Sequence, residues 1–130
     1  MVIGGGLVGA ETAEYLANKG HQVTIVEMMD KIAAGESTTV LPLMMKDFAD
    51  HNVKQLVNTK VDHIENNIVY TANEQIKADT IINALGSKKN IFDDSSITIP
   101  HVCVGDCSGE RTADIASAIR TAYKAANEIG

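Results

Sequence analysis

The chain has 130 residues, of which 45% are hydrophobic, and its formal net charge at pH 7 is −6. A chain of this length can bury roughly two thirds of its unfolded surface, which is enough for one domain with a core. The acidic charge and the lack of a basic tract argue against nucleic acid or a membrane surface as partner, and no apolar run approaches the roughly 20 residues of a membrane span. Two cysteines, Cys103 and Cys107, make no disulfide framework and indicate a reducing, cytoplasmic location.

The N-terminal quarter predicts a strand, a helix and a second strand. Residues 1–3 are an apolar strand end, residues 7–18 have helical spacing of apolar side chains before the stop signal Gly20, and residues 23–26 are a β-branched strand. This order is a βαβ unit, whose strands pair in parallel through a right-handed crossover. Because strands average about 5–6 residues and the first is so short, we expect the chain to begin inside a longer polypeptide.

The middle of the chain predicts one helix and several short strands. A helix should begin near residues 38–40 and run to His51, because Pro42 is tolerated only in a first turn. The expected strands are, in chain order, residues 53–57, 60–64, 68–71, 75–77 and 80–85. Those over 60–77 form a β-meander, in the place where a simple dinucleotide-binding fold has a crossover helix.

The C-terminal part follows a polar segment, residues 87–96, that is the best candidate for a domain boundary. Residues 97–99 and 102–104 predict strands, and Cys103 alternates with valines in a pattern that favours a core position. Residues 113–129 predict a helix with one apolar face.

A glycine turn joins the first strand to the first helix. Residues 4–9 (GGGLVG) match G-x-G-x-x-G. Gly4 permits the tight turn, Gly6 lets the backbone approach a pyrophosphate, and Gly9 lets the helix pack closely on the sheet. The helix N-terminus then offers free N–H groups to phosphates. A glycine turn without a ligand is the alternative, but its place between strand and helix favours a dinucleotide site in a three-layer, Rossmann-like β/β/α domain.

An acidic residue ends the second strand and bears on the choice of cofactor. Glu27 follows Gly4 at roughly the 20-residue spacing expected of the side chain that binds the adenosine ribose. Its carboxylate can accept hydrogen bonds from the ribose hydroxyls, each worth about 1.5–3 kcal/mol, and would repel a 2′-phosphate. The following loop has Lys31 as its only cation and no arginine. The pattern therefore predicts NAD(H) rather than NADP(H), with a solvated strand end as the alternative interpretation of Glu27.

Four segments together resemble a known family of flavoproteins. They are residues 2–13 (VIGGGLVGAETA), 23–28 (VTIVEM), 84–86 (ALG) and 104–107 (VGDC). In this order they are similar to the C-terminal part of NADH:flavin oxidoreductases, the long members of the old yellow enzyme family such as 2-enoate reductase, dienoyl-CoA reductase and trimethylamine dehydrogenase. The wider superfamily of pyridine-nucleotide flavoproteins shares the pattern.

The resemblance implies an NAD-binding domain inserted into an FAD-binding domain. Residues 1–89 would be the NAD(H)-binding domain, and residues 90–130 a strand–helix segment like the return part of the FAD-binding domain. The implied cofactor-binding residues are Gly4, Gly5, Gly6, Leu7, Val8, Gly9, Glu27, Met28, Ala84, Leu85, Gly86, Gly105 and Asp106. Of these, Asp106 would hold the ribityl chain of the flavin. The resemblance also implies that the parent protein binds FAD, and the long family members carry FMN and an iron–sulfur cluster as well. Because this sequence shows no first half of an FAD-binding domain, we expect this chain alone to be colourless and inactive.

Three functions stay open at this point. The first is the NADH-docking module of a flavin oxidoreductase, which needs no catalytic side chain because hydride transfer is cofactor chemistry. The second is a non-catalytic module that senses NAD. The third is a folded fragment that binds no ligand and forms a homodimer through exposed apolar surface. The expected partners are a nicotinamide dinucleotide and the flavin domains of the parent, and the spacing of histidines and cysteines indicates no metal site.

Overall fold

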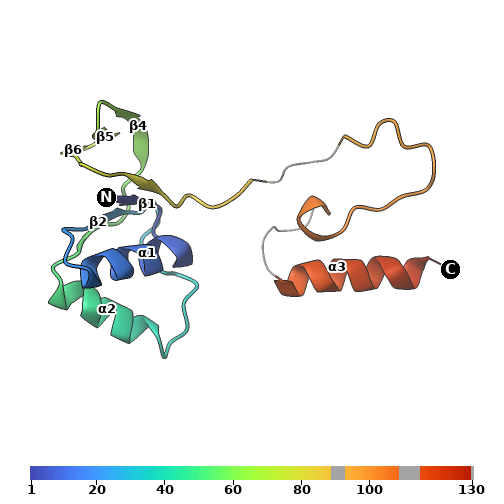
Figure 1. Cartoon of the computed structure of the whole chain (residues 1–130), viewed down its shortest axis with the longest axis horizontal. Coiled ribbons are helices and arrows are strands. Elements are labelled where there is room, and N and C mark those ends of the chain that lie inside the picture. The colour runs from blue at the N-terminus through green and yellow to red at the C-terminus, as the bar shows by residue number, and fades with distance from the viewer. Residues whose placement is uncertain (89–92, 109–114, 130) are drawn as a thin grey trace. The chain divides into compact units, whose positions relative to one another are not determined.

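The computed structural model describes residues 1–88, 93–108 and 115–129. It forms two compact units, Met1–Gly86 and Ser87–Gly130 (Figure 1). The predicted boundary between residues 89 and 90 lies outside the described residues. No helix in the described ranges is long and apolar enough to cross a membrane.

A parallel sheet forms the centre of the first unit. Its strands are β1 (Val2–Ile3), β2 (Thr24–Val26), β3 (Lys54–Leu56) and β7 (Ile82–Asn83), in the order β3-β2-β1-β7. In register, Val2 of β1 lies between Ile25 on one side and Ile82 on the other. All neighbouring pairs are parallel, so the predicted parallel pairing of the first two strands is confirmed.

Two helices cover one face of this sheet (Figure 1). The buried residues of helix α1 (Leu7–Asn18) are one glycine and three alanines, and their small size allows the helix to lie close to the strands. Helix α2 (Leu41–Asp50) contributes Met44 and Phe48, and Pro42 lies in its first turn as predicted. The core of the unit is built from these side chains and from Val2, Ala10, Ala13, Ala17, Val23, Ile25, Ile32, Ala33 and Val53.

The meander forms a second sheet on the opposite side of the parallel sheet (Figure 1). Its antiparallel strands are β4 (Val61–Glu65), β5 (Ile68–Thr71) and β6 (Gln75–Lys77). Asn66 and Asn67 make the β4–β5 turn with φ angles of 48° and 62°, which is the left-handed backbone that two-residue hairpins require. Val69 of the middle strand is fully buried. The predicted three-layer β/β/α arrangement is therefore confirmed.

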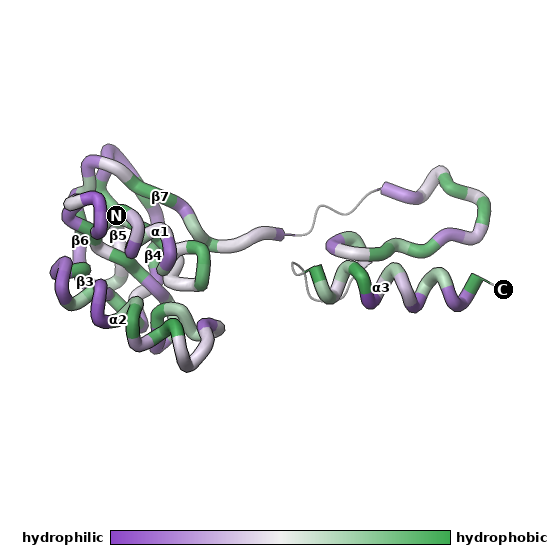
Figure 2. The backbone as a smooth tube through the Cα atoms, turned by 60° about the horizontal axis from the view of Figure 1, so that its bottom comes forward, coloured by the Kyte–Doolittle hydropathy of each residue, from purple (hydrophilic) through white to green (hydrophobic). Residues whose placement is uncertain are grey.

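The second unit contains η1 (Gly105–Cys107) and α3 (Ile115–Glu128). Thr121 joins them, because its Oγ1 accepts a hydrogen bond from the Gly105 N–H at 2.8 Å. The hydrophobic residues of α3 are spread along the helix (Figure 2), and Ile115, Ile119 and Tyr123 are 80%, 64% and 72% exposed. Ahead of η1, Asp94 Oδ2 accepts a hydrogen bond of 2.8 Å from His101 Nε2, and this bond raises the pKa of His101.

Several predicted strands are shorter than expected or do not form. The strand expected over residues 80–85 is limited to β7, and the helix expected from residues 38–40 begins at Leu41. Residues 97–99 and 102–104 form no strand, because the described part of their unit offers no strand with which they could pair. Cys103 is exposed, so the prediction of a core position is wrong. Residues 113 and 114 of the predicted last helix lie outside the described residues.

We predict that Phe48→Ala lowers the free energy of unfolding by about 3–5 kcal/mol, because it empties a fully buried site. Chemical denaturation of the purified chain measures this loss. Leu43 lies on the same helix and is 65% exposed, so Leu43→Ala should change stability by no more than about 0.5 kcal/mol. Equal losses in the two variants would contradict the placement of α2.

Candidate functional site

The candidate residues of the first unit follow the carboxyl ends of three neighbouring strands. The glycine turn follows β1, Glu27 and Met28 follow β2, and residues 84–86 follow β7. Because these strands are parallel and adjacent, their carboxyl ends meet at one edge of the sheet. Ligands of open α/β sheets bind at this edge. The fold thus brings together the predicted residues of the first unit.

Two glycines of the turn are required by close contacts. Gly4 has a φ of +100°, and a Cβ there would lie 2.5 Å from the carbonyl oxygen of Ala84. A Cβ on Gly9 would overlap the carbonyl oxygen of Gly4. A Cβ on Gly6, in contrast, would meet no atom within 4 Å. Gly4 and Gly9 therefore hold the turn together, whereas Gly6 borders open space where a ligand could approach.

The open side of the turn is the N-terminus of α1. Gly6 is the N-cap residue, no side chain caps the helix, and its first turn holds no acidic residue. The first backbone N–H groups of a helix have no partner within the helix and favour an anion. Leu7 and Val8, the first two helical residues, are 41% and 69% exposed. This end of α1 is therefore suited to a pyrophosphate.

Glu27 is held beside the glycine turn by backbone hydrogen bonds. Its Oε2 accepts the N–H of Gly5 at 2.6 Å, and its Oε1 accepts the N–H of Met29 at 2.8 Å. A carboxylate oxygen has two lone pairs, so each oxygen can accept a further hydrogen bond from a hydroxyl. The half-buried carboxylate is thus fixed in place and still able to bind a ribose.

Exposed apolar side chains border the same edge. Met28 and Met29 after β2 are 65% and 57% exposed, and Leu85 after β7 is 69% exposed. Asn83 shapes the turn at Leu85, because its Oδ1 accepts the Leu85 N–H at 3.1 Å. Met29 and Asn83 were not among the residues predicted from the sequence. A polar side chain that ends an apolar strand was the available signal for Asn83, and none pointed to the backbone N–H of Met29.

Gly105 and Asp106 lie in the second unit. Gly105 has a φ of +67° and opens η1, and Asp106 is exposed. The predicted residues therefore divide between the two units, eleven in the first and these two in the second. Among the described residues, no group of three or more His, Cys, Asp or Glu could hold a metal ion.

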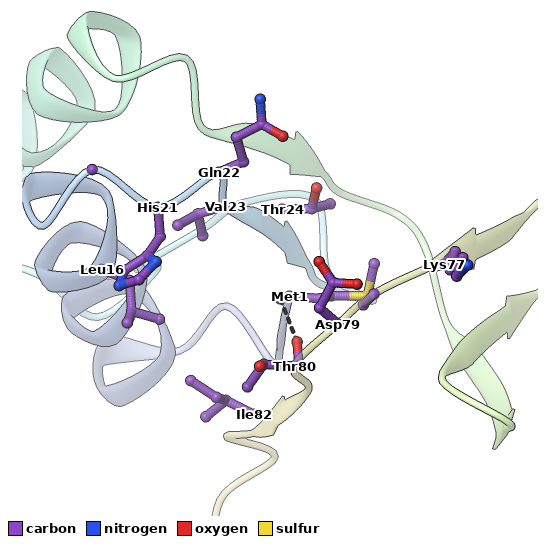
Figure 3. Close-up of a pocket in the computed structure, with 12 residues that line it drawn as sticks. Met1, Leu16, His21, Gln22, Val23, Thr24, Lys77, Asp79, Thr80 and Ile82 are labelled. Carbon is purple, nitrogen blue, oxygen red and sulfur yellow. Dashed lines mark hydrogen bonds between the residues drawn. The ribbon is translucent and has the colours of Figure 1, made fainter.

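A cavity of about 710 Å³ lies at the other edge of the parallel sheet (Figure 3). Its lining includes Met1, Val23 and Thr80, which precede β1, β2 and β7, so it is at the amino ends of the strands. The Met1 ammonium donates a hydrogen bond of 2.8 Å to the Thr80 carbonyl, and burial lowers the pKa of this amino group. None of the predicted cofactor-binding residues lines the cavity, which is separate from the candidate site.

Known proteins are similar to this chain over nearly its whole length. The sequence model of the pyridine nucleotide-disulphide oxidoreductase family matches residues 1–126. Bilirubin reductase of Mediterraneibacter gnavus is 46% identical over 99% of this chain and 21% of its own length. The chain thus spans about a fifth of that relative.

Two solved structures share the fold. A complex of 2-naphthoyl-CoA reductase superposes with a TM-score of 0.66 and 27% identity, over 95% of this chain and 20% of that one. The water-forming NADH oxidase of Lactobacillus brevis, bound to NADH, gives a TM-score of 0.57 and 25% identity, over 68% of this chain and 21% of that one. The predicted dinucleotide-binding fold is therefore confirmed.

We predict that Gly9→Ala lowers the free energy of unfolding by about 1–3 kcal/mol, because the new methyl group overlaps the Gly4 carbonyl. Gly6→Ala adds the same methyl group where no atom lies within 4 Å, so its effect should be smaller than about 1 kcal/mol. Thermal and chemical denaturation of both variants measure the difference. A Gly9→Ala variant as stable as Gly6→Ala would refute the close packing of α1 on the turn.

Proposed function

We propose, because the chain belongs to the pyridine nucleotide-disulphide oxidoreductase family, that it is the NAD(H)-binding module of a flavin-dependent oxidoreductase. The observation that carries this proposal is the Glu27 carboxylate, held 2.6 Å from the Gly5 N–H beside the open N-terminus of α1. This pairing of an anion site with a ribose acceptor fits a dinucleotide without a 2′-phosphate. The family resemblance supports the finer proposal of an NADH:flavin oxidoreductase of the long old yellow enzyme type.

The strand order sets the direction in which the dinucleotide would lie. The pyrophosphate would lie against Gly6 and the first N–H groups of α1, above β1. The adenosine ribose would bind Glu27 on the β2 side, where Met28 and Met29 offer apolar contact to the adenine. The nicotinamide would then extend toward β7 and Leu85, on the other side of β1.

The chain's part in catalysis would be binding and orientation. NADH, when bound, supplies the hydride, and no side chain of this site has to take or give a proton. The backbone N–H groups of α1 and the Glu27 carboxylate would fix the two phosphates and the ribose, which leaves the nicotinamide end at the exposed Leu85. We propose that another part of the enzyme presents the flavin there.

We also propose that residues 90–130 belong to the flavin-binding part of such an enzyme. Two observations support this. The apolar side chains Ile115, Ile119 and Tyr123 of α3 are exposed within the described part of their unit, and the chain spans only 21% of bilirubin reductase. Further polypeptide in the parent would cover this face. Asp106 and this further polypeptide would together bind FAD. The competing arrangement is a homodimer that forms through the same face of α3.

We predict that the chain binds NADPH at least tenfold more weakly than NADH, a difference of about 1.4 kcal/mol, because Glu27 repels a 2′-phosphate. Glu27→Gln should weaken NADH binding and narrow this gap, since it removes the charge and keeps the shape. Calorimetric titration with each nucleotide measures the dissociation constants of NADH and NADPH. Glu65→Gln, on the exposed end of β4, makes the same change of charge away from the site and should alter neither. Equal binding of both nucleotides by the unmodified chain would count against the role of Glu27.

Gly6→Val should weaken the binding of NADH and of NADPH by the same factor, about tenfold or more. The side chain would occupy the space of the pyrophosphate, which both nucleotides share, whereas the ribose site stays intact. Gly6 has a φ of −65° and a ψ of −177°, a backbone that valine adopts readily, so the variant should fold. The same titrations test this, with circular dichroism as the check on folding. A loss confined to one nucleotide would show that Gly6 does not face the pyrophosphate.

A further inference from the structure

We propose that Ala33 is a positioning residue for nucleotide selectivity: it clamps the glycine turn against Glu27 and so keeps the carboxylate at the ribose site. Ala33 is remote in sequence from the glycine motif and outside every motif discussed above. The inference rests on the proposed function, because it concerns the same site.

Hydrogen bonds hold both sides of Gly5, and we call the hydrogen-bonded set of Ala33, Gly5 and Glu27 the clamp. The Gly5 N–H donates to Glu27 Oε2 at 2.6 Å, and the Gly5 carbonyl accepts the Ala33 N–H at 2.6 Å. Side chains close the remaining space, since a Cβ on Gly5 would lie 2.6 Å from Ile32 Cδ1 and 2.9 Å from Glu27 Cβ. Gly5 is therefore packed between Glu27 at the end of β2 and Ile32 in the loop that follows.

The conformation of Ala33 is unusual for its residue type. Its φ is 51°, in the left-handed region that favours glycine, and its side chain is fully buried. Such a backbone persists where the surroundings hold it in place. Here Ala33 and the neighbouring Ile32 belong to the hydrophobic core that also contains Phe48 of α2. The core of the unit thus fixes the loop, and the loop fixes Gly5.

This arrangement should affect the ribose site more than the pyrophosphate site. The Glu27 carboxylate has two backbone partners, Gly5 and Met29, on opposite oxygens. Displacing Ala33 would release the Gly5 peptide and leave the carboxylate held at Met29 alone. The first N–H groups of α1 are not part of the clamp. A loosened clamp should therefore lower the discrimination between NADH and NADPH more than it lowers affinity for both.

The test measures the ratio of the NADPH to the NADH dissociation constant in matched variants. Ala33→Val places a β-branched side chain in a left-handed backbone and should lower the ratio by about threefold or more, toward that of Glu27→Gln. Ala33→Gly adopts the same backbone freely and should keep the ratio. In a chain that already carries Glu27→Gln, Ala33→Val should change the ratio of dissociation constants by less than about twofold, because Ala33 acts through Glu27.

Asn52 supplies a matched control. It has a φ of 54°, close to that of Ala33, but it precedes the amino end of β3, away from the glycine turn. Asn52→Val should therefore cost stability and leave the ratio unchanged. If Ala33→Val fails to fold, Ile32→Val removes only the methyl group nearest Gly5 and should lower the ratio in the same direction.

Hydrogen exchange of the Gly5 amide, followed by NMR, separates this inference from the proposed function. The amide should be protected in the free chain and exchange faster in the Ala33→Val, Ile32→Val and Glu27→Gln variants. If the unmodified chain binds neither nucleotide, the proposed function fails. The selectivity role of Ala33 then fails with it, even if the Gly5 amide is protected from exchange. If it binds NADH selectively, and folded Ala33→Val and Ile32→Val variants keep both the ratio and the Gly5 protection, the inference alone is overturned.

Discussion

The close approach of α1 to the end of β1 is the constraint on which the rest of the site depends. The Gly4 carbonyl occupies the space where a Gly9 side chain would be, and the Gly4 backbone lies against Ala84 at the end of β7. One contact region therefore sets the distance from helix to sheet and the spacing of two strand ends. The alanines along α1 extend the same close packing through the core. The open N-terminus of the helix is then directed over the carboxyl edge of the sheet.

The sequence predicted those features that local patterns determine. The order of an apolar strand, a helix and a β-branched strand led to the parallel βαβ unit, and the short strands expected over residues 60–77 led to the meander. The packing roles of Gly4 and Gly9 also follow from the motif, and the contacts of these two glycines agree with them.

The remaining features depend on contacts that sequence patterns do not contain. Residues 102–104 have the composition of a strand, yet a strand also needs a neighbour to pair with, and composition cannot supply one. Cys103 is exposed for the same reason. The left-handed backbone of Ala33 could not be predicted either, because alanine is not a residue type that favours this conformation. The hydrophobic core around Ala33 holds its backbone there. The N–H of Met29, which binds Glu27, belongs to the backbone and has no signature in the sequence at all.

The two oxygens of Glu27 show why backbone geometry controls this edge more than side-chain identity does. Both accept backbone N–H groups, so the position of the carboxylate depends on the paths of the glycine turn and of the loop after β2. The neighbouring side chains, Met28 and Met29, are more than half exposed and do not hold it. A loop anchored through Ile32 and Ala33 in the core can therefore vary at its exposed positions while the acceptor stays in place. In the proposed nucleotide site, this separates two tasks within one short segment, because the buried residues position the Glu27 carboxylate and the exposed residues would be free to contact the base.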